Sequence, residues 1–453
     1  MTSVALSTPR RSKAARATVL LGGALLSGAI AQAVFTFAVV RWFTTETTGT
    51  FFIGLAVLTL VGYIGRFGTE QLALREASPA WANGEYQSFR EIAAWMRQTV
   101  LRGTALSGLL TLALLAAIAL IARPEALTNS PEIWLAVLAM APISMVTTGC
   151  ALLRAGDRLV ASISARYLAI FILALALLAL GVNIDVIPAS PMLSLGLSAA
   201  VVSYFVWRDV TSLTEAKPTP TTEYVAPDRR SAAAQLTTST LLTAALTWTD
   251  RLILGALAGT AAVGVYGVAW QLVLPFNLVY LLSGTVSSPT FARLYAAGEL
   301  AKLETTTRAL SLAHAVAATG LGALIIVATP TVLNFVGDEY SDVQLLTIIL
   351  IVGQVINLSA GQVGMLYAMA GQDSALLRIT GYSTLISLIA IFGLTIPFGA
   401  TGTAVGVTVG LVTKNLALAV VARTHLDIAP TFLLPKRQER ASGPVRAIVE
   451  MLA

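Results

Sequence analysis

Charged residues are scarce in this chain of 453 residues: Asp, Glu, Lys and Arg make up 11% of it, whereas hydrophobic residues make up 56%. A water-soluble domain carries about 25% charged residues, and a surface this poor in charge does not suit a large protein in water. The sequence therefore predicts that lipid is the solvent for much of the molecule. The net charge is +6, but the basic residues are scattered between apolar runs. That pattern argues for membrane orientation and against binding to nucleic acid.

Reactive side chains and catalytic motifs are also rare. The single cysteine, Cys150, lies in an apolar run, which excludes disulfides and Cys-based metal sites. The two histidines, His314 and His425, are far apart and have no motif partner. There is no Gly-Lys dipeptide and therefore no P-loop, and HExxH, CxxC and Gly-x-Ser-x-Gly are missing too. We therefore expect no enzyme activity of the chain's own, no cofactor and no metal.

Long apolar runs, by contrast, recur along the whole chain. Most are near the ~20 residues that a spanning helix needs, and none alternates over ~10 residues as a membrane β-strand does. We predict an all-α, polytopic membrane protein of about twelve transmembrane helices. The segments are 18–40, 49–64, 103–122, 133–153, 159–180, 187–207, 234–257, 263–286, 309–328, 345–369, 379–396 and 402–422.

Lys and Arg are unevenly divided between the two predicted sides. If the N-terminus is cytoplasmic and the segments alternate, 25 of the 29 basic residues are cytoplasmic, and only Arg41 and Arg123 lie outside. Cytoplasmic loops of membrane proteins carry such an excess. A miscount by one helix would remove the bias, so it supports twelve spans independently of hydropathy. The prediction is a multi-pass protein of the inner (plasma) membrane with both termini in the cytoplasm.

Similar motifs at corresponding places indicate an internal repeat. Thr48-Gly49-Thr50-Phe51 after the first segment matches Val263-Gly264-Val265-Tyr266 after the seventh, and Ala82-Asn83-Gly84-Glu85 matches Ala296-Ala297-Gly298-Glu299. The predicted parts are a six-helix bundle (1–210), a Thr/Pro-rich cytoplasmic linker (211–231), a second six-helix bundle (232–424) and a cytoplasmic tail (425–453). Two parallel repeats around a central cavity are a transporter arrangement.

Three stretches resemble polysaccharide-export flippases of the O-antigen/oligosaccharide-lipid translocase type. They run from Val40-Arg41-Trp42-Phe43 to Phe67-Gly68-Thr69-Glu70, from Thr249-Asp250-Arg251-Leu252 to Val263-Gly264-Val265-Tyr266, and over Ile396-Pro397-Phe398-Gly399. That family belongs to the multidrug/oligosaccharidyl-lipid/polysaccharide exporter superfamily. The resemblance implies a transporter that flips polyprenyl-diphosphate-linked oligosaccharides from the inner to the outer leaflet by alternating access. It provides no universal catalytic signature.

Charges inside the apolar segments are the first candidate site residues, because such charges are costly in lipid and usually face a cavity or a partner. Lys414 lies about eight residues, roughly 12 Å, from the inner end of the last segment, which is near the limit for snorkelling. Adjacent helical residues diverge by ~100°, so we expect Asp250 and Arg251 not to pair with each other. Each faces either the cavity or another helix. Arg166 either snorkels or lines the cavity, and Arg41 is either an interface anchor or a cavity residue.

Amides at membrane depth are the second group of candidates. Gln271 and Asn277 flank Pro275 in the eighth segment, and Gln354 and Asn357 recur in the tenth. A proline frees a backbone carbonyl in a membrane helix, and amides can bind sugar hydroxyls. The alternative is that these amides join helices to one another, which is their commoner use.

The net charge of the candidate residues distinguishes the two leading functions. Arg41, Arg166, Arg251 and Lys414 against Asp250 give a net charge of +3, which suits a diphosphate, whereas a cavity for cationic drugs should be acidic. The leading prediction is therefore a flippase of lipid-linked oligosaccharides, and the alternative is a cation-coupled drug antiporter of the same superfamily. A membrane glycan polymerase ranks lower because every predicted outer loop is short. The expected partners are the lipid-linked substrate, the bilayer and the polysaccharide polymerase machinery.

Overall fold

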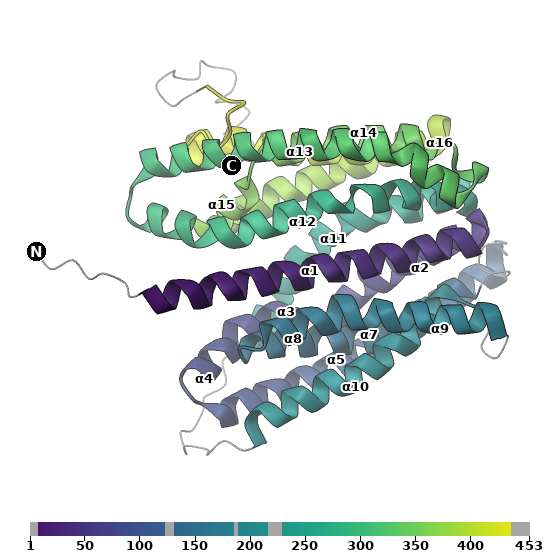
Figure 1. Cartoon of the computed structure of the whole chain (residues 1–453), viewed down its shortest axis with the longest axis horizontal. Helices are drawn as coiled ribbons and strands as arrows, with labels where there is room; N and C mark the ends of the chain where they lie inside the picture. The colour runs from purple at the N-terminus through teal and green to yellow at the C-terminus, as the bar shows by residue number, and fades with distance from the viewer. Residues whose placement is uncertain (1–7, 123–130, 185–188, 216–228, 436–453) are drawn as a thin grey trace, which may run out of the picture. The chain divides into compact units, whose positions relative to one another are not determined.

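The computed structural model describes residues 8–122, 131–184, 189–215 and 229–435, and over these residues every regular element is a helix. This agrees with the predicted all-α class. Figure 1 shows the helices in chain order. They are α1 (Thr8–Trp42), α2 (Thr45–Arg66), α3 (Thr69–Leu72), η1 (Ala73–Ala77), α4 (Ser78–Ala82), α5 (Tyr86–Ala122), α7 (Glu132–Ala155), α8 (Leu159–Ile163), η2 (Ser164–Ala169), α9 (Ile170–Ile184), α10 (Pro191–Glu215), α11 (Arg229–Ala258), α12 (Thr260–Ala296), α13 (Leu300–Val336), η3 (Asp338–Tyr340), α14 (Val343–Ser359), α15 (Val363–Met369) and α16 (Asp373–His425).

Ten helical stretches in the described part of the chain are long and apolar enough to cross a membrane. One of them, α16, holds both the eleventh and the twelfth predicted segment, which are separated by a kink at Gly399 (φ 54°, ψ −131°). The seventh predicted segment lies in α11 but is not among the ten. The protein is therefore an all-α, multi-pass membrane protein. Where the structure describes them, the predicted segments are helical apart from residues 189–190 of the sixth, before α10, and a short break in the tenth, between α14 and α15. Residues 187–188 of the sixth segment lie outside the described part.

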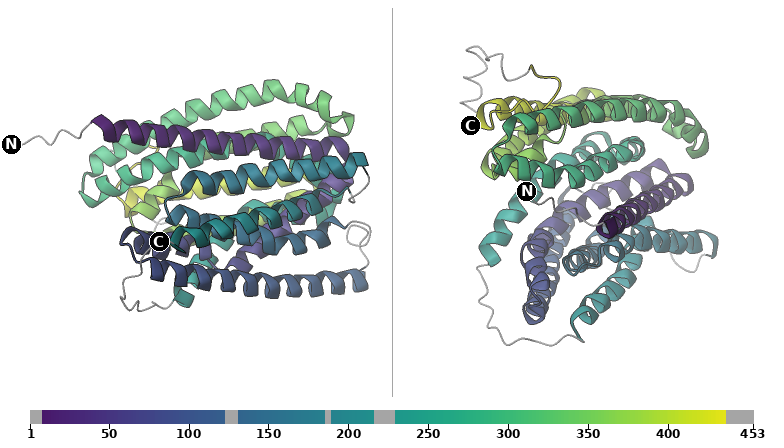
Figure 2. Two further views of the ribbon diagram at one scale, coloured as in Figure 1. Left: turned by 60° about the horizontal axis from the view of Figure 1, so that its bottom comes forward. Right: turned by 60° about the vertical axis from the view of Figure 1, so that its left-hand side comes forward.

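The chain divides into two compact units. Unit 1 comprises residues 1–42 and 54–241, and unit 2 comprises residues 43–53 and 242–453. The predicted boundary fell at the 211–231 linker, of which 216–228 lies outside the described residues. Within unit 1, α7 packs against α5 and α10, and α1 packs against η2 and α9; within unit 2, α14 packs against α12, α13 and α16. Figure 2 gives two further views in which these helices can be followed.

Glycines bring α12 and the first turns of α2 into close contact in unit 2. A Cβ on Gly49 would collide with the carbonyl oxygen of Thr260, and one on Gly264 would collide with the carbonyl oxygen of Thr45. Small residues allow such close approach of membrane helices. Gly49 and Gly264 are the glycines of the first pair of matching motifs, so these two repeat-related positions pack on one another.

The second pair of matching motifs folds into the same turn in each unit. Gly84 (φ 78°) and Gly298 (φ 69°) both adopt the left-handed conformation. In the first turn the Glu85 N–H donates to the Ala80 carbonyl (2.8 Å), and in the second the Glu299 N–H donates to the Leu294 carbonyl (3.0 Å). Such backbone bonds satisfy the last carbonyls of a helix and end it at a glycine. The local geometry thus repeats as the sequence predicted.

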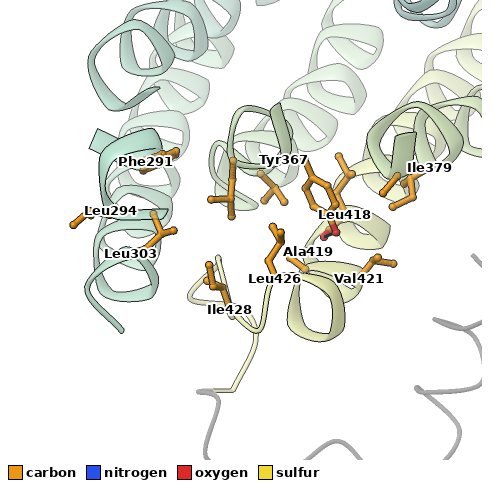
Figure 3. Packing of buried hydrophobic residues seen from close by; sticks show 14 residues of the cluster. Phe291, Leu294, Leu303, Tyr367, Ile379, Leu418, Ala419, Val421, Leu426 and Ile428 are labelled. Atoms are coloured by element: carbon orange, nitrogen blue, oxygen red, sulfur yellow. Dashed lines mark hydrogen bonds between the residues drawn. The ribbon is translucent and has the colours of Figure 1, made fainter. Parts of the chain in front are cut away.

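A short C-terminal strap, residues 426–434, completes the packing of unit 2. Leu426 and Ile428 are buried in a cluster with side chains of α12, α13, α15 and α16, among them Leu303 and Tyr367. Figure 3 shows these side chains pointing toward one another. The part of the predicted tail that the structure describes is therefore packed on the helices, while residues 436–453 lie outside the described part.

Candidate functional site

A group of arginines surrounds one glutamate in unit 1. Arg66 Nε lies 2.7 Å from Glu70 Oε1, and Arg166 Nη1 lies 3.3 Å from Glu70 Oε2. Arg66 also lies over the Tyr63 ring at 4.3 Å. Arg154, at the end of α7, interacts electrostatically with Glu70 and Arg166. The cluster therefore has more cationic than anionic groups, and we call it the Glu70 cluster.

Irregular backbone positions these side chains. Between α2 and α3, Phe67 (φ 47°) and Gly68 (φ 66°) both adopt the left-handed region, so the helix breaks between Arg66 and Glu70. Arg166 lies in the π-helical segment η2. Helix breaks and π-turns in membrane proteins and enzymes concentrate at functional sites. The resemblance covered Phe67 to Glu70, but hydropathy gave no sign that this stretch holds a charged cluster.

Glu70 is held as a carboxylate by its neighbours. Burial raises the pKa of the Glu70 carboxyl. The nearby charges of Arg166 and Arg66 lower the pKa by more than burial raises it, so it lies below the ordinary value. A carboxylate flanked by opposite charges is stabilised in its charged form. Glu70 therefore neutralises part of the arginine charge rather than serving as a neutral acid.

In unit 2, Asp250 and Arg251 pair with each other, which corrects the prediction that they would not. Arg251 Nη1 lies 3.0 Å from Asp250 Oδ1 and also donates to the Thr247 carbonyl at 2.8 Å. The prediction was wrong because it considered only the directions of the two Cβ atoms. An arginine side chain is long enough to fold back along the helix toward a short neighbour.

Aromatic side chains enclose this ion pair. The Tyr266 hydroxyl donates to Asp250 Oδ2 at 2.6 Å, and the Trp270 indole N–H lies 3.0 Å from the same oxygen. The Arg251 guanidinium lies over the rings of Trp248 (4.6 Å) and Trp270 (5.4 Å). Asp250 is completely buried. Such a pair is costly to form but fixed in place, so Asp250 serves to hold Arg251.

Lys414 is half-buried in α16 and has no hydrogen-bond or ion-pair partner among the described residues. Its neighbour Asn415 is engaged instead: its side-chain amide donates to Asn357 Oδ1 at 2.7 Å. Asn357 in turn donates to Gln354 Oε1 at 3.1 Å. The predicted amides of α14 thus join two helices, and their predicted role in sugar binding remains a prediction.

The other predicted residues lie apart from these networks. Arg41 is exposed in the last turn of α1. Gln271 is half-buried, and its Oε1 is buried without a hydrogen-bond partner within the described structure. Asn277 is exposed in α12. Each stays a prediction as a substrate-binding residue.

Sequence reasoning selected Arg166 and Arg251 but missed the residues around them. Glu70 and Arg66 were missed because they lie at the predicted end of the second segment, where charges are usual. Tyr266 and Trp270 were missed because aromatic residues in an apolar run look like core. Their spacing of four, which places both on one helix face, was the available signal.

The comparisons with known proteins agree with the resemblance. A family model described as polysaccharide biosynthesis protein matches residues 14–295, which is more than half of the chain. No curated protein matches the chain in sequence.

Solved structures share the fold along almost the whole chain. An inward-facing multidrug resistance MATE family transporter of the MOP superfamily matches with a TM-score of 0.70 at 13% identity, covering 90% of this chain and 98% of its own. The lipid II flippase MurJ, in an inward closed conformation, matches with a TM-score of 0.67 at 12% identity, covering 89% and 87%. A MOP superfamily transporter from Pyrococcus furiosus, described as having a binding pocket of reverse polarity, matches with a TM-score of 0.66 at 15% identity, covering 91% and 95%.

Proposed function

The chain belongs to the polysaccharide biosynthesis protein family, and we propose that it is a transporter that flips polyprenyl-diphosphate-linked oligosaccharides from the inner to the outer leaflet of the plasma membrane. The observation that carries this proposal is the excess of cations over acids in the Glu70 cluster, where Arg66, Arg154 and Arg166 accompany one glutamate. Lys and Arg are the natural partners of phosphate groups.

Two cations are the best candidates to meet the diphosphate. Arg154 in unit 1 and Lys414 in unit 2 are half-buried, and neither has a hydrogen-bond or ion-pair partner among the described residues. An unpaired diphosphate in an apolar pathway would be prohibitively costly, so cations that are not already neutralised favour its passage. Arg251 is a third candidate. Its Nη1 is bound to Asp250, but its Nε is buried without a hydrogen-bond partner in the described structure and is left as a donor for a phosphate oxygen.

A drug antiporter driven by a cation is the alternative, since the fold is shared equally with a multidrug transporter. In such a protein the pathway should attract cations. Here the acids of the two clusters, Glu70 and Asp250, are each bound to an arginine. This arrangement leaves no free carboxylate at either cluster and favours an anionic substrate.

Complementation of a flippase-null strain tests the proposal. We expect Arg154→Gln, Lys414→Gln and Arg251→Gln to slow export, and Arg154→Lys and Lys414→Arg to retain more of it, because charge is the property required. The matched control is Arg102→Gln, which removes one exposed charge from α5. Membrane levels and thermal stability of every variant are measured alongside. Full activity of all three Gln variants would overturn the proposal, and drug resistance without any change in glycan export would favour the antiporter.

A further inference from the structure

Unit 1 contains a groove between the first turns of α5 and the last turns of α10, away from the Glu70 cluster. Its volume is about 520 Å³. The floor is apolar and buried, formed by Phe89, Ala93, Trp207 and Val210. The Trp207 indole N–H donates to the Met145 carbonyl at 3.0 Å, which fixes the ring in the floor. The floor of the groove is thus apolar, and the orientation of its Trp207 ring is fixed.

The rim of the groove is polar and mainly cationic. The charged lining residues are Arg90, Arg97 and Glu215. Arg97 lies over the Trp207 ring at 5.8 Å. Arg90 and Arg97 are seven residues apart on one helix and so lie on the same face, about 10 Å apart along its axis. Two guanidinium groups above an apolar floor match a ligand with an anionic head and an apolar body.

The position along the helices agrees with that match. Trp207 lies near the end of a candidate span, Pro191–Leu213, and tryptophans concentrate at membrane interfaces. Past Leu101, which also lines the groove, α5 exposes a series of leucines, namely Leu106, Leu109, Leu110 and Leu114. These apolar side chains are expected in contact with acyl chains. The arginines therefore lie at the level of lipid headgroups, and the leucines lie deeper.

We propose that this groove binds one anionic phospholipid of the inner leaflet. Its phosphate lies between Arg90 and Arg97, and the first part of its acyl chains lies on Trp207 and Leu101. Basic pockets between transmembrane helices on the cytoplasmic side are suited to anionic headgroups. The assignment of the inner leaflet follows the topology predicted from the basic residues. The site is separate from the residues invoked for transport, so it does not depend on the proposed function.

Native mass spectrometry of the purified full-length protein tests the proposal. The protein is exchanged into mixed micelles of phosphatidylglycerol and phosphatidylcholine, and the lipid that remains bound is measured. We expect one phosphatidylglycerol on the wild type and a loss of about tenfold or more in its retention on Arg90→Gln/Arg97→Gln. The matched control is Arg102→Gln/Arg208→Gln, which removes two exposed charges from the same helices outside the groove and should retain the lipid.

The remaining outcomes decide the identity of the occupant. Equal retention by both double variants would overturn the proposal, because the lipid would then be held by general charge. A variant that fills the groove, Ala94→Trp, should also release the lipid, and retention by it would count against the site. Displacement of phosphatidylglycerol by an equimolar short-chain polyprenyl diphosphate would assign the groove to a transport substrate instead. Displacement by millimolar inorganic phosphate would assign it to a free anion. Either displacement would overturn the choice of a phospholipid.

Discussion

At the scale of single residues, Asp250 and Arg251 form a buried ion pair whose loss should reduce the stability of the fold. Breaking a buried pair leaves one charge uncompensated and costs about 3–5 kcal/mol. We therefore expect Asp250→Asn to lower the free energy of unfolding by that amount, measured by denaturation in detergent. Asp209→Asn is the control, because its partner Arg158 is 49% exposed at the side chain and an exposed pair contributes at most about 1 kcal/mol. Equal effects of the two variants would contradict the interpretation.

Glu70 makes the stability of the fold depend on pH in the acidic range. Its pKa is lowered in the folded state from an ordinary value of 4.5, so the folded state binds its proton less readily than the unfolded state. Its contribution to stability is therefore complete above about pH 4.5 and is lost as the pH falls through the lowered pKa. We expect the stability difference between the wild type and Glu70→Gln to be constant above that pH and to shrink below it. A difference that grows on acidification would refute the prediction.

The candidate residues were predictable from the sequence, but their partners were not. A charge inside an apolar run stands out, and that is how Arg251 and Lys414 were found. Which neighbour a charge binds depends on side-chain length and on helix packing. The Asp250–Arg251 pair shows the first dependence, and the approach of Arg166 to Glu70, 96 residues away in the chain, shows the second.

Among the elements, α2 and α12 approach each other closely at two glycines in unit 2. Gly49→Val should disrupt it, because a side chain there collides with backbone atoms of α12 that cannot move aside. Overpacking of this kind costs about 1–3 kcal/mol or more. Gly320→Val is the control, because a Cβ there meets nothing within 4 Å. Thermal unfolding in detergent should show a loss for Gly49→Val that clearly exceeds the loss for Gly320→Val.

The C-terminal strap is held by hydrogen bonds as well as by its buried side chains. Arg308 Nη1 donates to the Thr431 carbonyl at 2.9 Å and to the Leu434 carbonyl at 2.6 Å. We expect Arg308→Gln to increase hydrogen exchange in residues 426–434, since the strap loses a charged donor worth about 1.5–3 kcal/mol. Thr305→Ala, an exposed change on the same helix, should leave that exchange unaltered. Unchanged exchange in Arg308→Gln would show that apolar packing alone holds the strap.

The sequence predicted the positions of the helices better than it predicted where their backbone is kinked or broken. Apolar runs marked the helices well because lipid requires them to be apolar over a span. The kink at Gly399 falls in the gap between the last two predicted segments, as expected from Pro397 and Gly399. The break at Phe67 and Gly68 was not predicted, because it lies past the apolar run, and local backbone conformation there depends on tertiary contacts.

At the scale of the whole molecule, the internal repeat limits which membrane topologies are possible. The turns at Gly84 and Gly298 have the same backbone hydrogen bonds, and the turns at Asp157 and Gly371 also correspond, each with a left-handed residue (φ 62° and 68°). Two halves with the same local structure in the same chain order are expected to have the same orientation in the membrane if each holds six spans. An even number of spans per half then places the linker on the same side as the N-terminus.

Topology mapping tests this arrangement and the predicted twelve spans together. Thr221→Cys places a thiol in the linker that, by the excess of Lys and Arg, should be cytoplasmic. Cys150 is buried, so a Cys150→Ala background removes the native thiol at small cost and leaves one reporter. We expect a membrane-impermeant maleimide to label Thr221→Cys only after the cells are opened. Asp342→Cys, between η3 and α14, is the control and should react in intact cells. Labelling of Thr221→Cys from outside would reverse the assignment, and with it the leaflet in which the groove between α5 and α10 binds its lipid.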